Sequence, residues 1–334
     1  MKSMAVLNTI PSISVVLCTY NRADLLYRAL GALCGQTLDT HLFEVIIIDD
    51  GSTDRTRSIV DSFRDLLPLH YAYQDNSGLA SGKNHGLFLS RSPIILFLDD
   101  DDVADSKLLE QHLLRHRQYP QLEYAVLGYT DLTESVALSP LMHYVTEIDC
   151  RLFSYPHLQD GAVLDYTHFW GGRSSCKRMF LLEHGVFNPI FRFGAEDIEL
   201  GFRLSKVGLK VVFDRQAISH MIRVLDFESF CRRSYLQGQS NWVFSQLHNE
   251  PVVQKWSQVN NAEEKWKKLE PIFERLIKSA RDIDRFAQCR VNNSLTIDEL
   301  TKALLYRAYG AAFTASFIKG VVNKKHFQLE GQPK

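Results

Sequence analysis

Three short runs of apolar, mostly β-branched residues constrain the fold of this chain more than any other feature. They occupy residues 13–17 (ISVVL), 44–48 (EVIII) and 94–98 (IILFL). Runs of this kind are typical of strands that are buried on both faces of a parallel sheet. Residues 23–34 and 54–66, which follow the first two runs, have apolar residues at helical spacing. This alternation predicts a doubly wound α/β fold that binds ligands at the carboxyl ends of its strands.

The later part of the chain changes pattern. Residues 130–169 form a long irregular segment with scattered histidines and aromatic residues, and long loops of this kind are usually functional. The pattern also predicts a strand at 69–73, a helix at 82–90, a strand from 124, a strand leading into a short helix at 174–184, a helix at 196–207 closed by Gly208, a strand at 209–214 and a mainly helical tail interrupted at Pro271.

Length and composition predict a globular protein of two domains. The 334 residues are 45% hydrophobic and 23% charged, and this length exceeds what one compact core usually supports. We therefore expect one domain at residues 1–225 and a helical C-terminal region at 226–334. The six cysteines form no CxxC pair, and the first residues lack a signal-peptide pattern. These features predict a reducing, cytoplasmic setting.

Charge is unevenly distributed between these two regions. Residues 1–225 contain 21 Lys and Arg against 27 Asp and Glu, whereas residues 226–334 contain 17 against 12. A basic tail is compatible with peripheral contact with an anionic membrane, and the alternative is a solvated helical face. The stretch from Leu304 is interrupted by Arg307 and Lys319, so it does not read as a membrane span. Nucleic-acid binding is not indicated.

Each of the three apolar runs ends in polar residues: CTYNR at 18–22, DDGSTD at 49–54 and DDDD at 99–102. Four consecutive aspartates repel one another, and a divalent cation held by oxygens relieves that repulsion. With His220 as a nitrogen ligand, Mn²⁺ or Mg²⁺ fits better than a structural zinc site. The alternative for the second motif is a helix N-cap, and Asp102 and Asp105 could likewise cap the helix that follows them.

Common phosphate-binding motifs are absent from the sequence. The segment GLASGKN at 78–84 has three residues between its glycines instead of four, and Asn84 stands where a P-loop has Ser or Thr. No GxGxxG follows the first apolar run. The sequence therefore supports neither a P-loop NTPase nor a dehydrogenase.

Six motifs occur in a fixed order: SVVLCTYNR, EVIIIDDGSTD, NSGLASGKNHG, ILFLDDDD, FWGGRSS and GAEDIELGFRLSKVG, with a later His220. In this order they resemble the family 2 glycosyltransferases of GT-A fold over about residues 11–222. The later motifs are most similar to chondroitin-polymerase-type and β-1,4-galactosyltransferase-like members. The resemblance implies a Rossmann-like mixed α/β sheet with a mainly helical C-terminal extension.

The resemblance also implies a donor site at the strand ends. It assigns donor or metal binding to eight positions: Thr19 and Tyr20 at the nucleoside, Asp50 at the base, Lys83 at the base or phosphate, Asp99 and Asp100 near the ribose, and Asp101 and His220 on the metal. The alternatives are a surface lysine at position 83 and a core histidine at position 220.

Glu196 and Asp197 open a predicted helix, where free amides and the helix dipole favour an ionised carboxylate. A fixed, ionised carboxylate is what a general base requires. The resemblance implies that Asp197 takes the proton from the acceptor hydroxyl and that Glu196 orients the acceptor. The alternative is a pair of residues that only caps the helix.

Residues 170–172 (WGG) are expected to form a turn that brings backbone close to the sugar, with Gly172 at the donor. The indole of Trp170 would stack on the sugar, and the alternative is a core position. Arg173 departs from the family pattern, which often has a small residue here. We expect its charge to reshape the sugar or acceptor pocket.

Together with these features, the resemblance implies a metal-dependent, inverting glycosyltransferase. It would move a sugar from a nucleoside diphosphate, expected to be UDP, to a hydroxyl of a carbohydrate or glycolipid acceptor in polysaccharide or glycoconjugate synthesis. One alternative is a sugar nucleotidyltransferase, which usually has a Gly-rich, Arg-containing loop after its first strand. The other is a non-catalytic carbohydrate-binding protein, which would not need Asp101, Asp197 and His220 together.

Overall fold

The computed structural model describes residues 10–330, which form two compact units. The first, here called the sheet unit, comprises the chain up to Asp131, Leu158–Arg192 and Glu196–Ile222. The second, here called the helical unit, comprises Leu132–His157, Phe193–Ala195 and the chain from Arg223 onward. The helical unit therefore includes the whole predicted tail and two segments that precede it.

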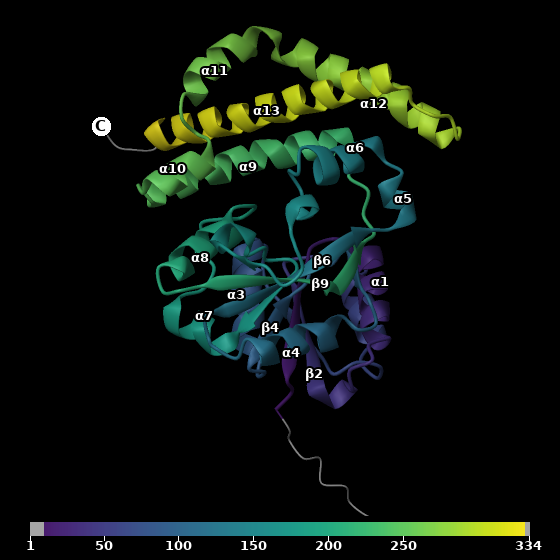
Figure 1. Cartoon of the computed structure of the whole chain (residues 1–334), viewed down its shortest axis with the longest axis vertical. Helices are drawn as coiled ribbons and strands as arrows, with labels where there is room; N and C mark the ends of the chain where they lie inside the picture. The colour runs from purple at the N-terminus through teal and green to yellow at the C-terminus, as the bar shows by residue number, and fades with distance from the viewer. Residues whose placement is uncertain (1–9, 331–334) are drawn as a thin grey trace, which may run out of the picture. The chain divides into compact units, whose positions relative to one another are not determined.

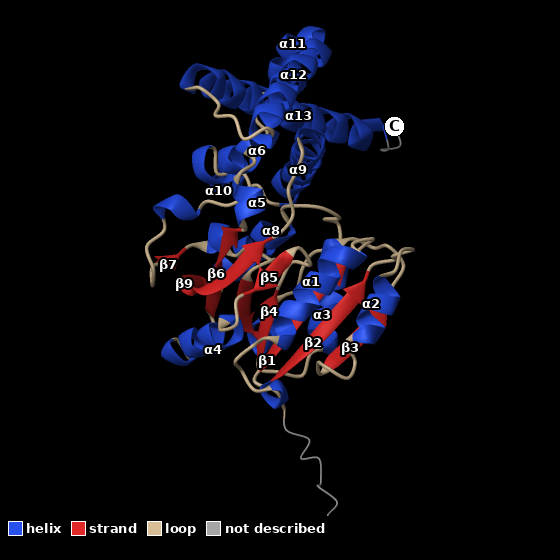
Figure 2. Cartoon of the chain, turned by 90° about the vertical axis from the view of Figure 1, so that its right-hand side faces the viewer, coloured by secondary structure: helices blue, strands red, loops and turns tan. Residues whose placement is uncertain are grey.

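The strands of the described chain form one mixed sheet in the order β3-β2-β1-β4-β8-β6-β9-β5, with β7 beside β9 (Figure 2). Strands β1 to β4 pair in parallel, whereas the pairs β4–β8, β6–β8, β5–β9 and β7–β9 are antiparallel. The strand bounds are β1 Ile13–Thr19, β2 Phe43–Asp49, β3 Leu69–Tyr73, β4 Ile94–Phe97, β5 Asp102–Ala104, β6 Tyr124–Leu132, β7 Val163–Leu164, β8 Ser174–Lys177 and β9 Lys210–Met221.

The three apolar runs form the parallel strands β1, β2 and β4, as predicted. Thr19 pairs with Asp49, and Val16 pairs with Phe97, so β1, β2 and β4 end at one edge of the sheet. The three polar motifs follow these strand ends. Parallel pairing therefore brings together side chains that lie about 80 residues apart in the sequence.

Helices cover both faces of the parallel strands. In β1, Ile13, Val15 and Leu17 belong to a core cluster with α1, whereas Val16 faces α3, as alternating side chains of a strand require. A Cβ atom on Gly86 of α3 would lie 2.3 Å from Val16 Cγ1, so only glycine allows this approach. The helix bounds in the sheet unit are α1 Ala23–Cys34, α2 Thr56–Ser62, α3 Leu79–Leu89, α4 Leu108–Gln118, α7 Arg178–His184 and α8 Glu196–Ser205, with 3₁₀ helices η1 Thr40–Leu42 and η4 Tyr166–His168.

The segment expected to be irregular, residues 130–169, contains several short elements. These are α5 Glu134–Ala137, α6 Pro140–His143, the π-helical turn η2 Tyr144–Ile148 and the 3₁₀ helix η3 Tyr155–His157, followed by β7 and η4. Tyr144 packs against Tyr306, Tyr309 and Phe313 of α13 with ring centroids 5.2 to 6.3 Å apart. These short turns are stabilised by contacts with a helix that lies 160 residues further along the chain.

The remaining helical unit is built on two long helices, α9 Phe227–Leu247 and α13 Glu299–Glu330, which lie side by side (Figure 1). The tail is therefore mainly helical, as predicted. Its other elements are α10 Pro251–Ser257, α11 Ala262–Leu269, η5 Glu270–Ile272 and α12 Phe273–Asn292, and Pro271 lies in η5 between two helices. Among the helices of residues 10–330, none is long and apolar enough to cross a membrane.

Candidate active site

The aspartate run, residues 99–102, follows β4 and leads into β5, which pairs with β9. Asp100 and Asp102 are only 2% and 0% exposed. Burial raises the pKa of Asp100 to about 6 and that of Asp102 to about 7, and in both cases the carboxylate of Asp101 adds to the shift. Their negative charge is therefore concentrated in a poorly solvated place.

Two arginines partly offset this charge. Arg22 Nη1 lies 2.7 Å from Asp100 Oδ1 and 3.6 Å from Asp101 Oδ2. Arg173 Nη2 lies 3.1 Å from Asp99 Oδ2 and 3.4 Å from Asp102 Oδ2. The sequence pattern predicts only a metal ion as the balancing cation. It indicates no such role for Arg22, although this residue stands in the first strand-end motif.

The helix-cap interpretation of Asp102 is wrong. Its carboxylate is fully buried in β5 and accepts hydrogen bonds from the hydroxyls of Thr130 and Ser219. Helix α4 has Lys107 at its N-cap, and the amide of that residue donates to Asp105 Oδ1. Burial of Asp102 follows from the pairing of β5 with β9, which local sequence does not reveal.

Of the two predicted metal ligands, Asp101 directly precedes β5 and His220 lies in β9, the strand that pairs with β5. His220 in β9 pairs with Val103 in β5, and the amide of Ile222 donates to the carbonyl oxygen of Asp101. Within residues 10–330, no three His, Cys, Asp or Glu side chains are grouped as they would be around a metal ion. The donor set still fits Mn²⁺ or Mg²⁺: it offers carboxylate and imidazole groups, and Asp102 Oδ1 is a buried oxygen without a hydrogen-bond partner.

The Gly171–Gly172 turn lies directly between the aspartate run and Asp197. A Cβ atom on Gly172 would lie 2.1 Å from Asp99 Oδ2, and one on Gly171 would lie 2.5 Å from Lys83 Nζ and 3.3 Å from Asp197 Cβ. A side chain at either position would therefore displace a neighbour, Asp99 at position 172 and Lys83 at position 171. This turn links the two groups of carboxylates that the sequence singled out separately.

Asp197 lies in the first turn of α8, and both of its oxygens accept backbone hydrogen bonds. Oδ2 accepts from the Gly171 amide at 3.0 Å, and Oδ1 accepts from the Ile198 amide at 2.8 Å. The position of Asp197 at a helix start predicts a stabilised ionised form, but the pKa of Asp197 is raised to about 6. Burial is the main cause and the neighbouring Glu196 adds to it, whereas Lys83 and the two amides oppose it.

Lys83 and Glu196 form a buried ion pair. Lys83 Nζ lies 3.0 Å from Glu196 Oε1, and both residues are 3% exposed. Burial lowers the pKa of Lys83, but the charges of Glu196, Asp197 and Asp99 raise it more, so the net shift is upward. The surface-lysine interpretation of Lys83 is therefore wrong, because Gly82 and Gly86 hold α3 close against the sheet.

The predicted nucleoside side lies at the ends of β1 and β2. Thr19 is buried, and Tyr20 is 49% exposed. Asp50 Oδ1 accepts from Gln74 Nε2 and the Ser77 amide, and its Oδ2 accepts from the Gly78 amide. Asp50 thus holds the loop before α3. The capping interpretation of this motif applies instead to Asp54, which accepts from the amides of Ala23 and Thr56 at the starts of α1 and α2.

Trp170 is half-buried, so it is not a plain core residue. Its Nε1 donates to the carbonyl oxygen of Thr167 at 2.8 Å, and its ring packs against His168 with centroids 5.7 Å apart. Arg173 is directed at Asp99, Asp102 and the hydroxyl of Thr130. Arg173 thus contacts the aspartate run, and Trp170 lies at the start of the Gly171–Gly172 turn.

Solved structures identify the fold. TarS from S. aureus in complex with UDP aligns over 96% of this chain and 92% of its own, with a TM-score of 0.55 and 16% identity. The mannosyltransferase PcManGT from Pyrobaculum calidifontis, in complex with GDP-Man and Mn²⁺, covers 96% and 88% with a TM-score of 0.57 and 17% identity. The fold is therefore the GT-A fold of glycosyltransferases.

Sequence comparison then gives the family resemblance. Residues 14–169 match Glycosyl transferase family 2. Validoxylamine A glucosyltransferase from Streptomyces hygroscopicus subsp. jinggangensis is 33% identical over 231 residues, which cover 62% of this chain and 54% of the relative. Residues 14–169 therefore resemble glycosyltransferase family 2, in agreement with the fold and family that the motifs predicted. The chain spans about half the length of the validoxylamine A glucosyltransferases that it matches.

Proposed function

We propose that this chain transfers a sugar from a nucleoside-diphosphate donor to a hydroxyl of a carbohydrate or glycolipid acceptor, with inversion at the anomeric carbon. The observation that carries the proposal is the Gly171–Gly172 turn, which has the aspartate run on one side and Asp197 on the other. A donor site and a base for the acceptor must lie on opposite sides of the transferred sugar. The backbone of this turn lies between the two groups without a side chain to fill the space.

The donor side consists of the strand ends. We propose UDP as the nucleotide, as in the TarS complex, with Thr19 and Tyr20 at the nucleoside and Asp50 supporting its site through the loop before α3. Asp99 and Asp100 would lie near the ribose. Asp101 and His220 would hold Mn²⁺ or Mg²⁺, and a metal bound there supplies positive charge that stabilises the departing diphosphate.

Asp197 is the proposed general base. Two backbone amides fix its orientation, and its pKa of about 6 leaves it mostly ionised at neutral pH yet basic enough to accept a proton. Glu196 and Lys83 form an ion pair beside Asp197. Through their charges, Glu196 raises the pKa of Asp197 and Lys83 lowers it. Trp170 would stack on the sugar or acceptor, and Arg173 orients Asp99.

Release of nucleotide from a panel of UDP-sugars and GDP-mannose tests the reaction, with Mn²⁺ and with or without oligosaccharide acceptors. Asp197→Asn should bind UDP and metal as the parent does, but its rate of sugar transfer should fall by about 10²-fold or more. Asp101→Asn should lose the metal-dependent part of its UDP affinity. Asp61→Asn, an exposed acidic residue of α2, is the matched control and should behave as the parent does.

Two results would contradict the proposal. The first is near-native transfer by Asp197→Asn, which would mean that Asp197 is not the general base. The second is equal UDP affinity with and without metal, which would mean that no metal takes part in donor binding. NMR of the product decides inversion, because an α-linked donor must give a β-linked product.

A further inference from the structure

Helices α9 and α13 of the helical unit touch backbone to backbone. A Cβ atom on Gly238 in α9 would lie 2.1 Å from the carbonyl oxygen of Phe317, and one on Gly320 in α13 would lie 2.0 Å from that of Tyr235. These two glycines fix the helix pair at its closest approach. Tyr235 on α9 and Asn323 on α13, which flank this contact, are thereby held opposite each other.

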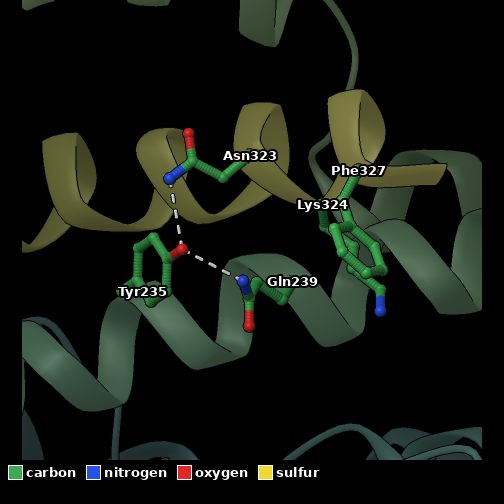
Figure 3. A pocket seen from close by; sticks show the side chains of 5 residues that line it. All are labelled: Tyr235, Gln239, Asn323, Lys324 and Phe327. Atoms are coloured by element: carbon green, nitrogen blue, oxygen red, sulfur yellow. Dashed lines mark hydrogen bonds between the residues drawn. The ribbon is translucent and has the colours of Figure 1, made fainter. Parts of the chain in front are cut away.

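Two cavities lie along this helix pair. The first has a volume of about 360 Å³ and is lined by Tyr235, Gln239, Asn323, Lys324 and Phe327 (Figure 3). The second has a volume of about 440 Å³. It shares Tyr235 and Asn323 with the first and adds, among others, Arg232, Phe273 and Lys319. The two cavities are therefore neighbours, and we call them together the α9–α13 groove.

The centre of the groove is a hydrogen-bonding group. The hydroxyl of Tyr235 accepts from Gln239 Nε2 at 3.1 Å and from Asn323 Nδ2 at 3.2 Å. Because both lone pairs of this oxygen are used, its own O–H proton is left to donate to a third group. Figure 3 shows the two amide oxygens directed away from the phenol. Oriented donors and acceptors of this kind match the hydroxyl groups of a sugar.

The rest of the groove is aromatic and basic. Phe327 is 72% exposed, and Lys324 Nζ lies 5.8 Å from its ring centroid. In the second cavity, Lys319 Nζ lies 4.2 Å from the ring centroid of Phe273. An exposed ring can stack on the apolar face of a sugar, and the lysines add positive charge.

The charge balance selects an anionic ligand. Arg232, Lys319 and Lys324 line the groove. Among the lining residues that the structure describes, Glu228 is the one carboxylate, and it forms an ion pair with Arg281 of α12. Because Glu228 is already paired with Arg281, the positive charges of Arg232, Lys319 and Lys324 are not balanced by it. A bound carboxylate or phosphate would balance them.

We propose that the α9–α13 groove binds an acidic oligosaccharide, a chain of sugars that carries carboxylate or phosphate groups. Two adjacent cavities accommodate consecutive sugar units, the rings stack on them, and Lys319 and Lys324 neutralise their charge. The groove gives the enzyme a site for its carbohydrate acceptor apart from the reaction centre. This last role rests on the proposed function, but binding itself does not. A membrane surface is disfavoured because amides and a phenol line a cavity instead of a flat basic face.

Isothermal titration of the whole protein, without donor, tests the proposal. The probes are tetragalacturonate, a phosphorylated mannotetraose and neutral maltotetraose, and vesicles of phosphatidylcholine with 30% phosphatidylserine form a further arm. At least one acidic probe should bind about tenfold or more tightly than maltotetraose. Tyr235→Phe and Lys324→Gln should each weaken that binding about tenfold, and circular dichroism checks that both variants fold.

Lys278→Gln is the matched control, because it removes one positive charge from an exposed position on α12 outside the groove. Equal binding of acidic and neutral probes, or an equal loss in the control, overturns the proposal. So does vesicle binding that depends on Lys324 without any oligosaccharide binding. Sugar transfer is measured separately on the same preparations. Transfer without oligosaccharide binding refutes only the groove, and binding without transfer refutes only the proposed function.

Discussion

Replacing Gly172 with alanine tests the central geometric argument. The new Cβ atom would lie 2.1 Å from Asp99 Oδ2 and 2.4 Å from its Oδ1, whereas ordinary contacts begin near 3.4 Å. One of the two groups must therefore move by more than 1 Å. The turn itself is restrained, because the carbonyl oxygen of Gly172 accepts a hydrogen bond from the Asp99 amide at 3.0 Å.

The expected cost follows from this crowding. The Asp99 side chain must rotate away from the turn and loses its 3.1 Å contact with Arg173. Overpacking of this size lowers the free energy of unfolding by about 1–3 kcal/mol. A shift of about 1 Å at a reacting centre costs about 10²-fold in rate, so we expect sugar transfer to fall by that factor.

Gly31→Ala is the matched control, because a Cβ atom there meets nothing within 4 Å and the residue lies inside α1. It should stabilise the protein by about 0.5–1 kcal/mol and leave transfer unchanged. Urea unfolding and nucleotide release are measured on both variants. If Gly172→Ala kept parental stability and transfer, the turn would not be crowded and our description of the site would be wrong.

Two further predictions concern pH. The rate of transfer should fall as the pH drops through about 6, because Asp197 must be ionised to accept a proton. Glu196→Gln should move the midpoint of the pH–rate profile to lower pH, since it removes a charge that raises the pKa of Asp197; an unchanged midpoint would contradict this. Burial lowers the pKa of His112 from 6.5 to about 4, so the unfolded state takes up its proton first on acidification. Between pH 6.5 and 4 the free energy of unfolding should therefore fall by about 3 kcal/mol more in the parent than in His112→Gln, and parallel curves in urea titrations would argue against it.

Local sequence predicted the regular elements well where short-range forces decide them. The strand at residues 69–73 and the helix at residues 23–34 have the bounds that the apolar spacing indicated. Helix α3 instead begins at Leu79, three residues before the predicted start. Gly78 stands there with φ +89°, and a Cβ atom on it would lie 2.9 Å from Arg192 Cα. That boundary depends on a segment more than 100 residues away.

The composition of the site was visible in the sequence because its chemistry requires particular residue types. Carboxylates after buried strands, a glycine pair and an acidic helix start are recognisable without a structure. Their partners were not, because an ion pair depends on which strands and helices become neighbours. Arg22 reaches Asp100 across 78 residues, and Lys83 reaches Glu196 across 113.

The sequence by itself determined the fold class, the family resemblance and the list of acidic residues, since each follows from local pattern and order. Only the tertiary structure decided how those charges are balanced and how strongly Asp197 holds its proton. Burial and neighbouring charges set a pKa, and both depend on how close to one another distant segments of the chain lie. The pKa of Asp197 is about 6 because burial and the neighbouring Glu196 raise it more than Lys83 and the amides of Gly171 and Ile198 lower it.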